Sequence, residues 1–346
     1  MPNAVLNPPN PFDSTRIDWA GDHIDVEPPL AKLEVFEEEA RSILAENSSP
    51  DIPFRFSANP YRGCYHGCAY CYARSSHQYL GFGAGTDFER KIVVKKNAVA
   101  LLREQFEKKS WQGDVIALSG NTDCYQPLEA SYRLTRGLLE VCAEYRNPVG
   151  IITKSSIIRR DIALLARLNE VSSVRVTLSA AFADDETGRA LEPWASPISR
   201  RFETMKLLSD AGIPVGLSLA PIIPGINDSA IPELLERGKA AGARHAFIVL
   251  LRLSGEVLPV FDERLERAFP LRADKVRNAI RDMRDGAMNV TAFGKRMHGT
   301  GARWEVIEQL FQLHVRKLGL NASEELAALP TSFARPEKPK KQLSLF

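Results

Sequence analysis

The residues best suited to chemistry are three cysteines that lie close together, Cys64, Cys68 and Cys71, in the spacing C-x3-C-x2-C. Thiolates are soft ligands, and a loop can wrap around a metal centre only when they are this near in the chain. Gly63 and Gly67 allow the backbone to turn tightly there. A structural zinc site normally closes four protein ligands. Three thiolates leave one metal position open, so the spacing predicts a metal centre that takes part in a reaction.

A zinc site of three cysteines and one histidine is the alternative, with His66 as the fourth ligand. His66 lies between Cys64 and Cys68, too near both of them to complete a tetrahedron comfortably. We therefore interpret His66 as a residue that supports the loop rather than as a ligand. An odd count of five cysteines in 346 residues also excludes a disulfide-rich secreted scaffold.

An aromatic residue, Tyr70, comes just before the last cysteine, and the whole segment resembles the signature of the radical S-adenosylmethionine (SAM) superfamily. The resemblance implies a [4Fe-4S] cluster on the three cysteines, with its fourth iron bound by the amino and carboxylate groups of SAM. One electron from the cluster then cleaves SAM to methionine and a 5′-deoxyadenosyl radical, which abstracts a hydrogen atom. The resemblance also implies an external electron donor, such as flavodoxin or ferredoxin. It places Tyr70 near the adenine of SAM; a core aromatic is the alternative.

Elements that could position this loop follow from the pattern of apolar residues. Short β-branched runs predict strands over residues 54–59, 115–119, 149–153, 174–179, 215–220 and 246–251. Amphipathic runs predict helices over residues 98–108, 128–145, 158–168, 197–211 and 230–241. The alternation indicates parallel strands, either in a partial barrel or in a doubly wound sheet. The superfamily resemblance implies an α/β fold with a partial (βα)6 TIM-like barrel and the cluster loop after the first strand.

Polar residues follow several of the expected strands, where barrels of this kind collect their functional groups. Over residues 53–318 these segments resemble the spore photoproduct lyase-related, or DNA-repair photolyase-like, branch of the superfamily. That likeness implies that Lys154, Ser179 and Thr122 contact the aminocarboxylate part of SAM. A lysine paired with a carboxylate at a barrel mouth is physically reasonable. The alternative for Lys154 is an ordinary surface charge.

One position departs from that branch. Spore photoproduct lyases carry a hydrogen-donor cysteine two residues before the position of Thr122, and Gly120 stands there in this sequence. Cys124 lies four residues later and would be a hydrogen donor only if the loop curls back; a structural thiol is the alternative. Cys142 lies on an apolar helix face and is expected in the core. The departure argues against assigning thymine-dimer reversal to this protein.

Four parts are expected along the chain. Residues 1–50 form an acidic, loosely ordered N-terminal arm with one helix over residues 32–45. Residues 51–255 form the barrel, residues 256–322 a helical basic C-terminal extension, and residues 323–346 a flexible tail.

Charge is distributed unevenly among these parts. The arm holds ten acidic and three basic residues, so the overall charge of +2 is a cancellation. Residues 272–303 hold eight basic and three acidic residues. This stretch favours a polyanionic partner such as DNA, whose phosphates the basic side chains would neutralise. The alternative is an ordinary solvated helix face.

The chain ends in a short apolar cluster after a polar stretch. Its last five residues are Gln342, Leu343, Ser344, Leu345 and Phe346. They resemble the peptide by which bacterial DNA polymerases and repair proteins bind the β sliding clamp. A tail docked on its own domain is the alternative.

Composition and the absence of special segments narrow the compartment. No run approaches the ~18 apolar residues of a membrane span, and no signal-peptide pattern opens the sequence. We therefore expect a cytoplasmic protein without a membrane partner. The expected function is a radical SAM enzyme with a repair-related reaction on DNA. The alternatives are radical SAM modification of RNA, a peptide or a small molecule, and a non-catalytic iron-sulfur module for electron transfer or sensing on the sliding clamp.

Overall fold

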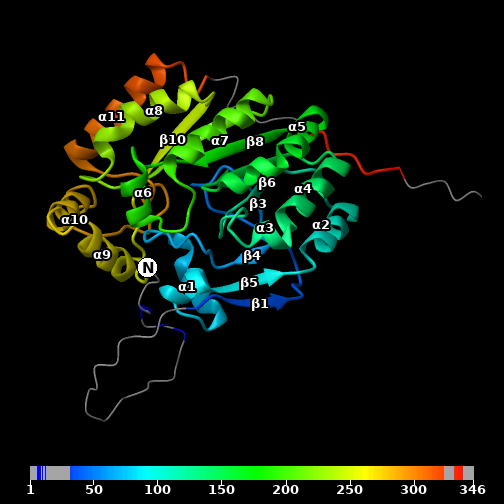
Figure 1. Ribbon diagram of the computed structural model, residues 1–346, viewed down its shortest axis with the longest axis horizontal. Helices are drawn as coiled ribbons and strands as arrows, with labels where there is room; N and C mark the ends of the chain where they lie inside the picture. The colour runs from blue at the N-terminus through cyan, green and yellow to red at the C-terminus, as the bar shows by residue number, and fades with distance from the viewer. Residues whose placement is uncertain (1–5, 9, 11, 13–31, 323–330, 338–346) are drawn as a thin grey trace, which may run out of the picture.

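A computed structural model describes residues 6–8, 10, 12, 32–322 and 331–337 (Figure 1). The clamp-like residues 342–346 lie outside the described residues. Within the described part, no helix has both the length and the apolar composition needed to cross a membrane.

The main sheet has seven strands in the order β10-β9-β8-β7-β6-β3-β2. Six of them run parallel in chain order, and β2 adds to β3 in the antiparallel sense. Their bounds are Leu44–Glu46 (β2), Phe56–Ala58 (β3), Ile116–Leu118 (β6), Val149–Thr153 (β7), Val174–Ser179 (β8), Val215–Ile222 (β9) and His245–Leu250 (β10). The expected α/β partial barrel with six parallel strands is therefore confirmed.

Helices cover the outer face of this sheet (Figure 1). The crossover helices are Ala98–Glu107 (α2), Leu134–Glu144 (α4), Ile162–Val171 (α5), Ile198–Asp210 (α7) and Ile231–Ala240 (α8). Short helices precede or interrupt them: Glu129–Tyr132 (α3), Ser156–Asp161 (η2), Asp185–Leu191 (α6) and Asp228–Ala230 (η3). The predicted helix over residues 128–145 is split at Arg133, whose φ of 53° ends α3. The side chain of Glu129 then accepts hydrogen bonds from the first turn of α4, at Thr135 N (3.0 Å) and Arg136 N (3.2 Å).

A second, three-stranded sheet was not predicted. It has the order β1-β5-β4, with bounds Glu34–Glu38 (β1), Lys91–Lys95 (β5) and Tyr61–Arg62 (β4). The predicted helix over residues 32–45 is wrong, because residues 34–38 pair in parallel with β5 and residues 44–46 pair with β3. Local propensity favoured a helix, and strand pairing across the chain overrides it. This part of the expected acidic arm is therefore integral to the fold rather than loosely ordered.

The C-terminal extension is helical, as expected. Its helices are Val257–Ala268 (α9), Ala273–Asp282 (α10) and Gly301–Lys317 (α11), and α11 packs beside α8. After α11, the Asn321 side chain accepts from Ala246 N (2.8 Å) and donates to Ala246 O (2.9 Å). These bonds cover the free edge of β10, which an open barrel would otherwise leave unpaired.

Residues 331–337 return to the barrel, which corrects the prediction of a flexible tail for this stretch. The Phe333 ring packs against Phe106 and Tyr145, at centroid distances of 5.6 and 6.3 Å. The guanidinium of Arg335 donates to the carbonyls of Phe106 (2.9 Å) and Lys108 (2.6 Å) at the end of α2.

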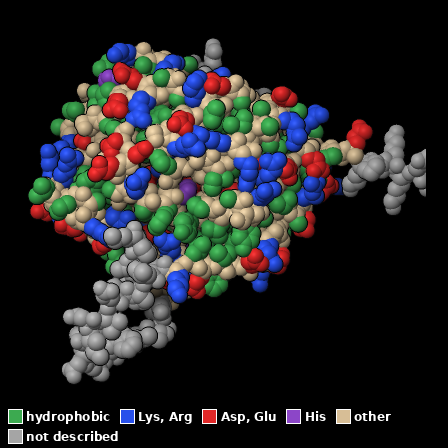
Figure 2. Space-filling view, in the orientation of Figure 1, with side chains coloured by type: hydrophobic (Ala, Val, Ile, Leu, Met, Phe, Trp, Pro, Cys, Tyr) green, Lys and Arg blue, Asp and Glu red, His purple; other side chains and the backbone are tan. Residues whose placement is uncertain are grey.

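On the surface, Lys and Arg side chains are intermixed with Asp and Glu over the face seen in Figure 2.

Candidate active site

The cysteine loop follows β3 and β4, at the carboxyl end of the first barrel strand, as the sequence predicted. The Cys64 amide donates to Phe88 O at 2.9 Å. Gly63 and Gly67 have φ of 75° and 65°, in the left-handed region that favours glycine. A Cβ at Gly63 would lie 2.9 Å from Phe88 O. The two glycines are therefore required by the close fold of this loop.

Between the cysteines and β5 lie two short helices, Tyr72–Leu80 (η1) and Thr86–Arg90 (α1). Arg74 of η1 is fully buried and shapes the loop from inside. It donates to Cys68 O at 2.8 and 3.0 Å and pairs with Glu89 of α1 at 2.6 Å. This pair was not predicted, because nothing in the spacing of Arg74 and Glu89 marks it.

The three thiols are free; Cys64 and Cys68 are buried and Cys71 is half-buried. Burial raises the pKa of Cys68 and of Cys71, against the charges of Lys154 and Arg74 respectively, which lower it. At Cys64 burial also acts to raise the pKa, but the charge and hydrogen bond of His66 outweigh it and lower the pKa. Cationic side chains thus stand beside each thiol, which suits a set of thiolate ligands.

A single-ion site is not supported by the geometry. Among the described residues, no group of three or more Cys, His, Asp or Glu is arranged to hold one metal ion. A tetrahedral zinc needs all its ligand atoms within ~2.3 Å of one point. In a [4Fe-4S] cluster each thiolate binds a different iron atom, so the sulfur atoms of the three cysteines can lie farther apart than around a single ion. Cys64, Cys68 and Cys71 are three soft thiolates on one loop, which is the donor set that an iron-sulfur cluster takes.

His66 is buried and faces a carboxylate, not solvent. Its Nδ1 lies 3.4 Å from Oδ2 of Asp123, in the loop after β6. Asp123 also accepts from Thr153 Oγ1 (2.7 Å) and from the Lys154 amide (2.8 Å), after β7. Burial acts to raise the pKa of Asp123, but His66 and these donors lower it to about 2. His66 therefore supports the loop, as we interpreted it.

Thr122 and Gln126, in the loop after β6 that contains Asp123, bind the backbone of the cysteine loop. The Thr122 hydroxyl donates to Gly63 O at 2.6 Å, and Gln126 Nε2 donates to the same carbonyl at 3.2 Å. Gln126 Oε1 accepts from the Tyr65 amide at 3.0 Å. The loop after β6 thus fixes the cysteine loop from the neighbouring strand.

A second buried group lies on the other side of the cysteines. The Tyr70 hydroxyl donates to Glu192, and Glu192 forms an ion pair with Arg201 of α7. Arg201 also donates to the carbonyls of Ser179 (2.9 Å) and Ser196 (2.7 Å). Burial acts to raise the pKa of Glu192, but the charges of Arg201 and Lys154 lower it. Neither Glu192 nor Arg201 was singled out from the sequence.

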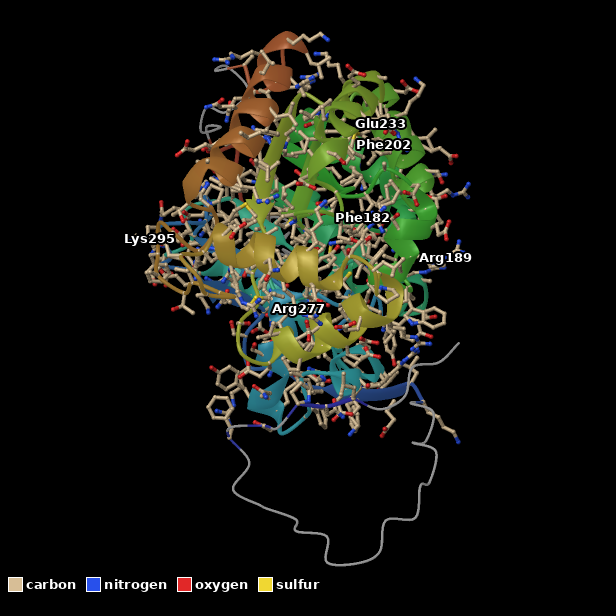
Figure 3. All side chains as sticks on the ribbon, turned by 90° about the vertical axis from the view of Figure 1, so that its left-hand side faces the viewer. Phe182, Arg189, Phe202, Glu233, Arg277 and Lys295 are labelled. Atoms are coloured by element: carbon tan, nitrogen blue, oxygen red, sulfur yellow. The ribbon has the colours of Figure 1, made fainter. Side chains whose placement is uncertain are left out.

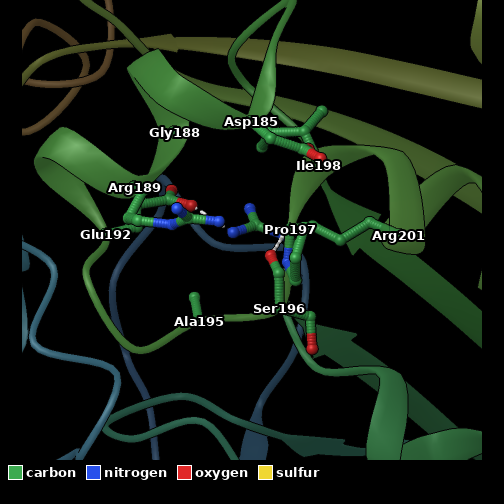
Figure 4. A pocket seen from close by; sticks show the side chains of 9 residues that line it. All are labelled: Asp185, Gly188, Arg189, Glu192, Ala195, Ser196, Pro197, Ile198 and Arg201. Atoms are coloured by element: carbon green, nitrogen blue, oxygen red, sulfur yellow. Dashed lines mark hydrogen bonds and ion pairs between the residues drawn. The ribbon is translucent and has the colours of Figure 1, made fainter.

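Figure 4 shows Glu192 and Arg201 beside a small cavity between α6 and α7. Its volume of about 20 Å³ holds one water molecule. The cavity is therefore too small for a cofactor the size of SAM.

Comparisons with known proteins place the chain. The family model described as the radical SAM superfamily matches residues 58–238. The chain belongs to the radical SAM superfamily. An uncharacterised protein of Mycobacterium tuberculosis is 36% identical over 232 residues, which cover 66% of this chain and 68% of that protein. A radical SAM Nalpha-GlyT isomerase of a Pseudomonas phage is 26% identical over 265 residues, which cover 75% of this chain and 51% of that protein.

Solved structures show the same fold. Spore photoproduct lyase with bound AdoMet and dinucleoside spore photoproduct has a TM-score of 0.57 at 14% identity, covering 88% of this chain and 86% of that chain. Another variant of that lyase has a TM-score of 0.59 at 15% identity, covering 89% and 87%. The fold is thus that of spore photoproduct lyase. As a radical SAM protein, the chain uses a [4Fe-4S] cluster and SAM.

The structure brings two of the residues predicted to bind SAM together. Lys154 Nζ lies 5.7 Å from the centre of the Tyr70 ring, and the charge of Lys154 acts on Cys68. Thr122 contacts the cysteine loop, as described above. Ser179 is buried at the end of β8, linked to the Tyr70 side only through Arg201. Direct contact of these four residues with SAM stays a prediction.

Cys124 and Cys142 are both fully buried in the core. Burial raises the pKa of both thiols. Cys142 lies in the core, as expected from its place on an apolar helix face. A hydrogen donor must reach the substrate radical, so the enclosed position of Cys124 supports the structural alternative.

Tyr72 lies beside the cysteine loop and was not predicted as a site residue. It directly follows Cys71, its side chain is 52% exposed, and its hydroxyl donates to Gly120 O at 2.6 Å. The resemblance to the lyase branch implies that Gly120 stands where that branch carries a donor cysteine. An aromatic residue next to a cluster ligand was the available signal.

Proposed function

We propose that this radical SAM enzyme acts on DNA in a repair-related reaction. The observation that carries the proposal is the cysteine loop at the mouth of a barrel with the fold of spore photoproduct lyase. A [4Fe-4S] cluster held by Cys64, Cys68 and Cys71 would supply the one-electron reductive cleavage of SAM that starts hydrogen abstraction.

The chain's own residues have separate tasks in this proposal. Cys64, Cys68 and Cys71 hold the cluster. Lys154 offers an ammonium group to the carboxylate of SAM, beside the Tyr70 ring. Burial acts against the charge of Lys154, but Cys68 and Glu192 raise its pKa, so it is cationic at neutral pH. Asp123 keeps the cysteine loop and the loop of Lys154 in fixed relation.

The charges of the basic C-terminal extension bear on whether DNA is the substrate. Figure 3 shows Arg277 and Lys295 on this extension. Arg277 is already neutralised by Asp262 (2.7 Å), Glu266 (2.6 Å) and Asp274 (3.0 Å). Lys295 is exposed. The basic stretch is therefore less available to phosphates than its composition suggested.

Product analysis tests the proposal. The reconstituted protein, reduced with dithionite and given SAM, is compared on lesion-bearing DNA, undamaged DNA and RNA. We expect 5′-deoxyadenosine and methionine in each case, with a changed base only in lesion-bearing DNA. A changed product in RNA alone supports the RNA alternative. Absence of 5′-deoxyadenosine, at full iron content, supports the non-catalytic module; Cys64→Ala is the cluster-free control.

Two partners belong to the proposal. An acidic electron carrier such as flavodoxin or ferredoxin supplies the electron. The β sliding clamp binds Gln342–Phe346, whose sequence supports it. A pull-down with clamp compares the full chain with a chain that lacks these five residues; equal retention of both contradicts clamp binding. The five free thiols support a reducing compartment, and we propose the cytoplasm.

A further inference from the structure

Three arginines gather where the last barrel strand ends. Arg252 lies two residues beyond β10, Arg284 follows α10, and Arg296 belongs to the segment between α10 and α11. Arg284 donates to Leu251 O (3.0 Å) and Arg296 O (3.1 Å), so it holds this segment against the strand. Figure 3 labels Lys295, the neighbour of Arg296, in this segment.

Only one of the three has a carboxylate partner among the described residues. Arg296 pairs with Asp51 at 2.6 Å and donates to Ser49 Oγ at 2.6 Å. Arg284 is satisfied in part by carbonyls. Arg252 has no ion pair in the described part of the chain, and Met297 Sδ lies 3.9 Å from its Nη1. Three cations therefore share one carboxylate.

Arg252 is half-buried, so its unpaired charge is costly to leave without an anion. Burial lowers the pKa of Arg252, and the nearby charge of Arg296 lowers it further. Burial also lowers the pKa of Arg284, to about 10, with a contribution from Arg252. The charge of Asp51 acts in the opposite direction, but this carboxylate pairs with Arg296, so Arg252 has no carboxylate of its own among the described residues.

The position of Arg252 is fixed relative to the cluster ligands. Its guanidinium lies 5.5 Å from the centre of the Tyr72 ring, and Tyr72 directly follows Cys71. Ser75, in the helix after the cysteines, donates to Glu256 at 2.8 Å. This bond ties the loop after β10 to the cysteine loop, so Arg252 stands at the mouth beside the reaction centre.

We propose that Arg252 receives a phosphodiester group of the nucleic-acid substrate at the barrel mouth. The planar guanidinium is suited to a two-point contact with phosphate oxygens, and partial burial strengthens that contact. This inference rests on the proposed function and specifies how the substrate backbone is oriented. Arg284 and Arg296 are positioning residues that hold the surrounding segment.

Binding of labelled oligonucleotides tests the inference. The full-length, reconstituted protein with SAM is titrated into a fluorescein-labelled single-stranded DNA or RNA at several salt concentrations, followed by anisotropy. We expect Arg252→Gln to weaken binding by about 5–30-fold and to reduce the log–log salt slope by about one phosphate contact. Arg252→Lys keeps the charge and recovers part of the affinity and most of the slope.

Arg103→Gln is the matched control, because it removes the same charge from α2, where Arg103 pairs with Glu144. It is expected to bind as the unmodified protein does. Equal affinity and slope for Arg252→Gln overturn the inference and leave the DNA proposal standing. Binding of RNA alone, dependent on Arg252, overturns the DNA proposal but keeps the phosphodiester contact. If the protein binds neither the DNA nor the RNA oligonucleotide, both the inference about Arg252 and the DNA proposal are overturned. An Arg252-dependent affinity for a labelled acidic peptide instead assigns the site to a peptide carboxylate.

Discussion

Nδ1 of His66 lies 3.4 Å from Oδ2 of Asp123, so one buried carboxylate joins the cysteine loop to the loop after the next barrel strand. The same carboxylate accepts from Thr153 and from the Lys154 amide after the third parallel strand. Three consecutive loops of the barrel mouth therefore depend on Asp123.

Asp123→Asn is expected to loosen the cysteine loop. The amide has no charge to pair with His66, and only one of its two terminal atoms can accept, whereas Oδ1 and Oδ2 of Asp123 accept from Thr153 and from the Lys154 amide respectively. We expect a loss of about 2–3 kcal/mol in the free energy of unfolding and less iron bound per chain after reconstitution. Urea denaturation and iron analysis measure these. Asp210→Asn, at an exposed pair with Lys206, is the control. Unchanged iron content in Asp123→Asn would contradict this role.

Glu192→Ala is expected to leave Arg201 buried without its anion. Removal of one partner from a buried ion pair costs about 3–5 kcal/mol, because the other charge stays uncompensated. The double variant Glu192→Met with Arg201→Met removes both charges and is expected to recover most of the loss. Thermal and urea unfolding compare the three proteins. If the double variant is as unstable as the single one, the charge explanation fails.

Cys124→Ala is expected to keep both cluster and turnover. The thiol is enclosed in the core, so its loss removes packing worth about 1 kcal/mol and no ligand. Cys142→Ala is the matched buried control, and Cys64→Ala is expected to lose both iron and 5′-deoxyadenosine formation. Product analysis on the active substrate decides the matter. Normal 5′-deoxyadenosine with lost product in Cys124→Ala alone would establish the thiol as hydrogen donor.

His245 gives the native protein an acid sensitivity. Burial, followed by the charge of Arg175, lowers its pKa to about 4, below the ~6.5 of an unfolded chain. Between these values the unfolded state binds a proton that the native state does not, so stability falls as the pH decreases through this window. Above pH ~7 the residue is neutral in both states and adds no pH dependence.

Urea denaturation at pH 7 and pH 4 measures this effect. The unmodified protein is expected to lose up to about 3 kcal/mol more than His245→Gln between the two values. Glutamine retains a polar partner for Thr177, whose hydroxyl lies 3.2 Å from His245 Nε2. An equal loss in both proteins would show that His245 does not titrate as described.

Sequence patterns predicted the barrel because several of its parallel strands are short runs rich in apolar and β-branched residues, such as Val174–Ser179, which are visible without knowing what they pair with. The cysteine loop was predicted for a similar reason, since its ligands lie within eight residues. The second sheet was missed because Glu34–Glu38 becomes a strand only by pairing with residues 91–95, far along the chain. Its acidic residues resemble a solvated helix until that partner is known.

The side chains around the cysteine loop also divide into those that the sequence predicted and those that it did not. Lys154 was recognised because it ends an apolar strand. Glu192, Arg201 and Arg252 lie in loops and in a helix with no diagnostic spacing, and only the folded chain brings them to Tyr70 and Tyr72. Tyr72 directly follows Cys71, so its place beside the cysteine loop could have been predicted from the sequence.

The position of residues 331–337 bears on how a substrate can approach the barrel. Phe333 and Arg335 are seated at Tyr145 and at the end of α2, near the segments that enter β6 and β7. The cysteine loop lies at the opposite edge of the sheet, where the strands end. Residues 331–337 therefore lie behind the barrel and leave the edge at the cysteine loop to a substrate.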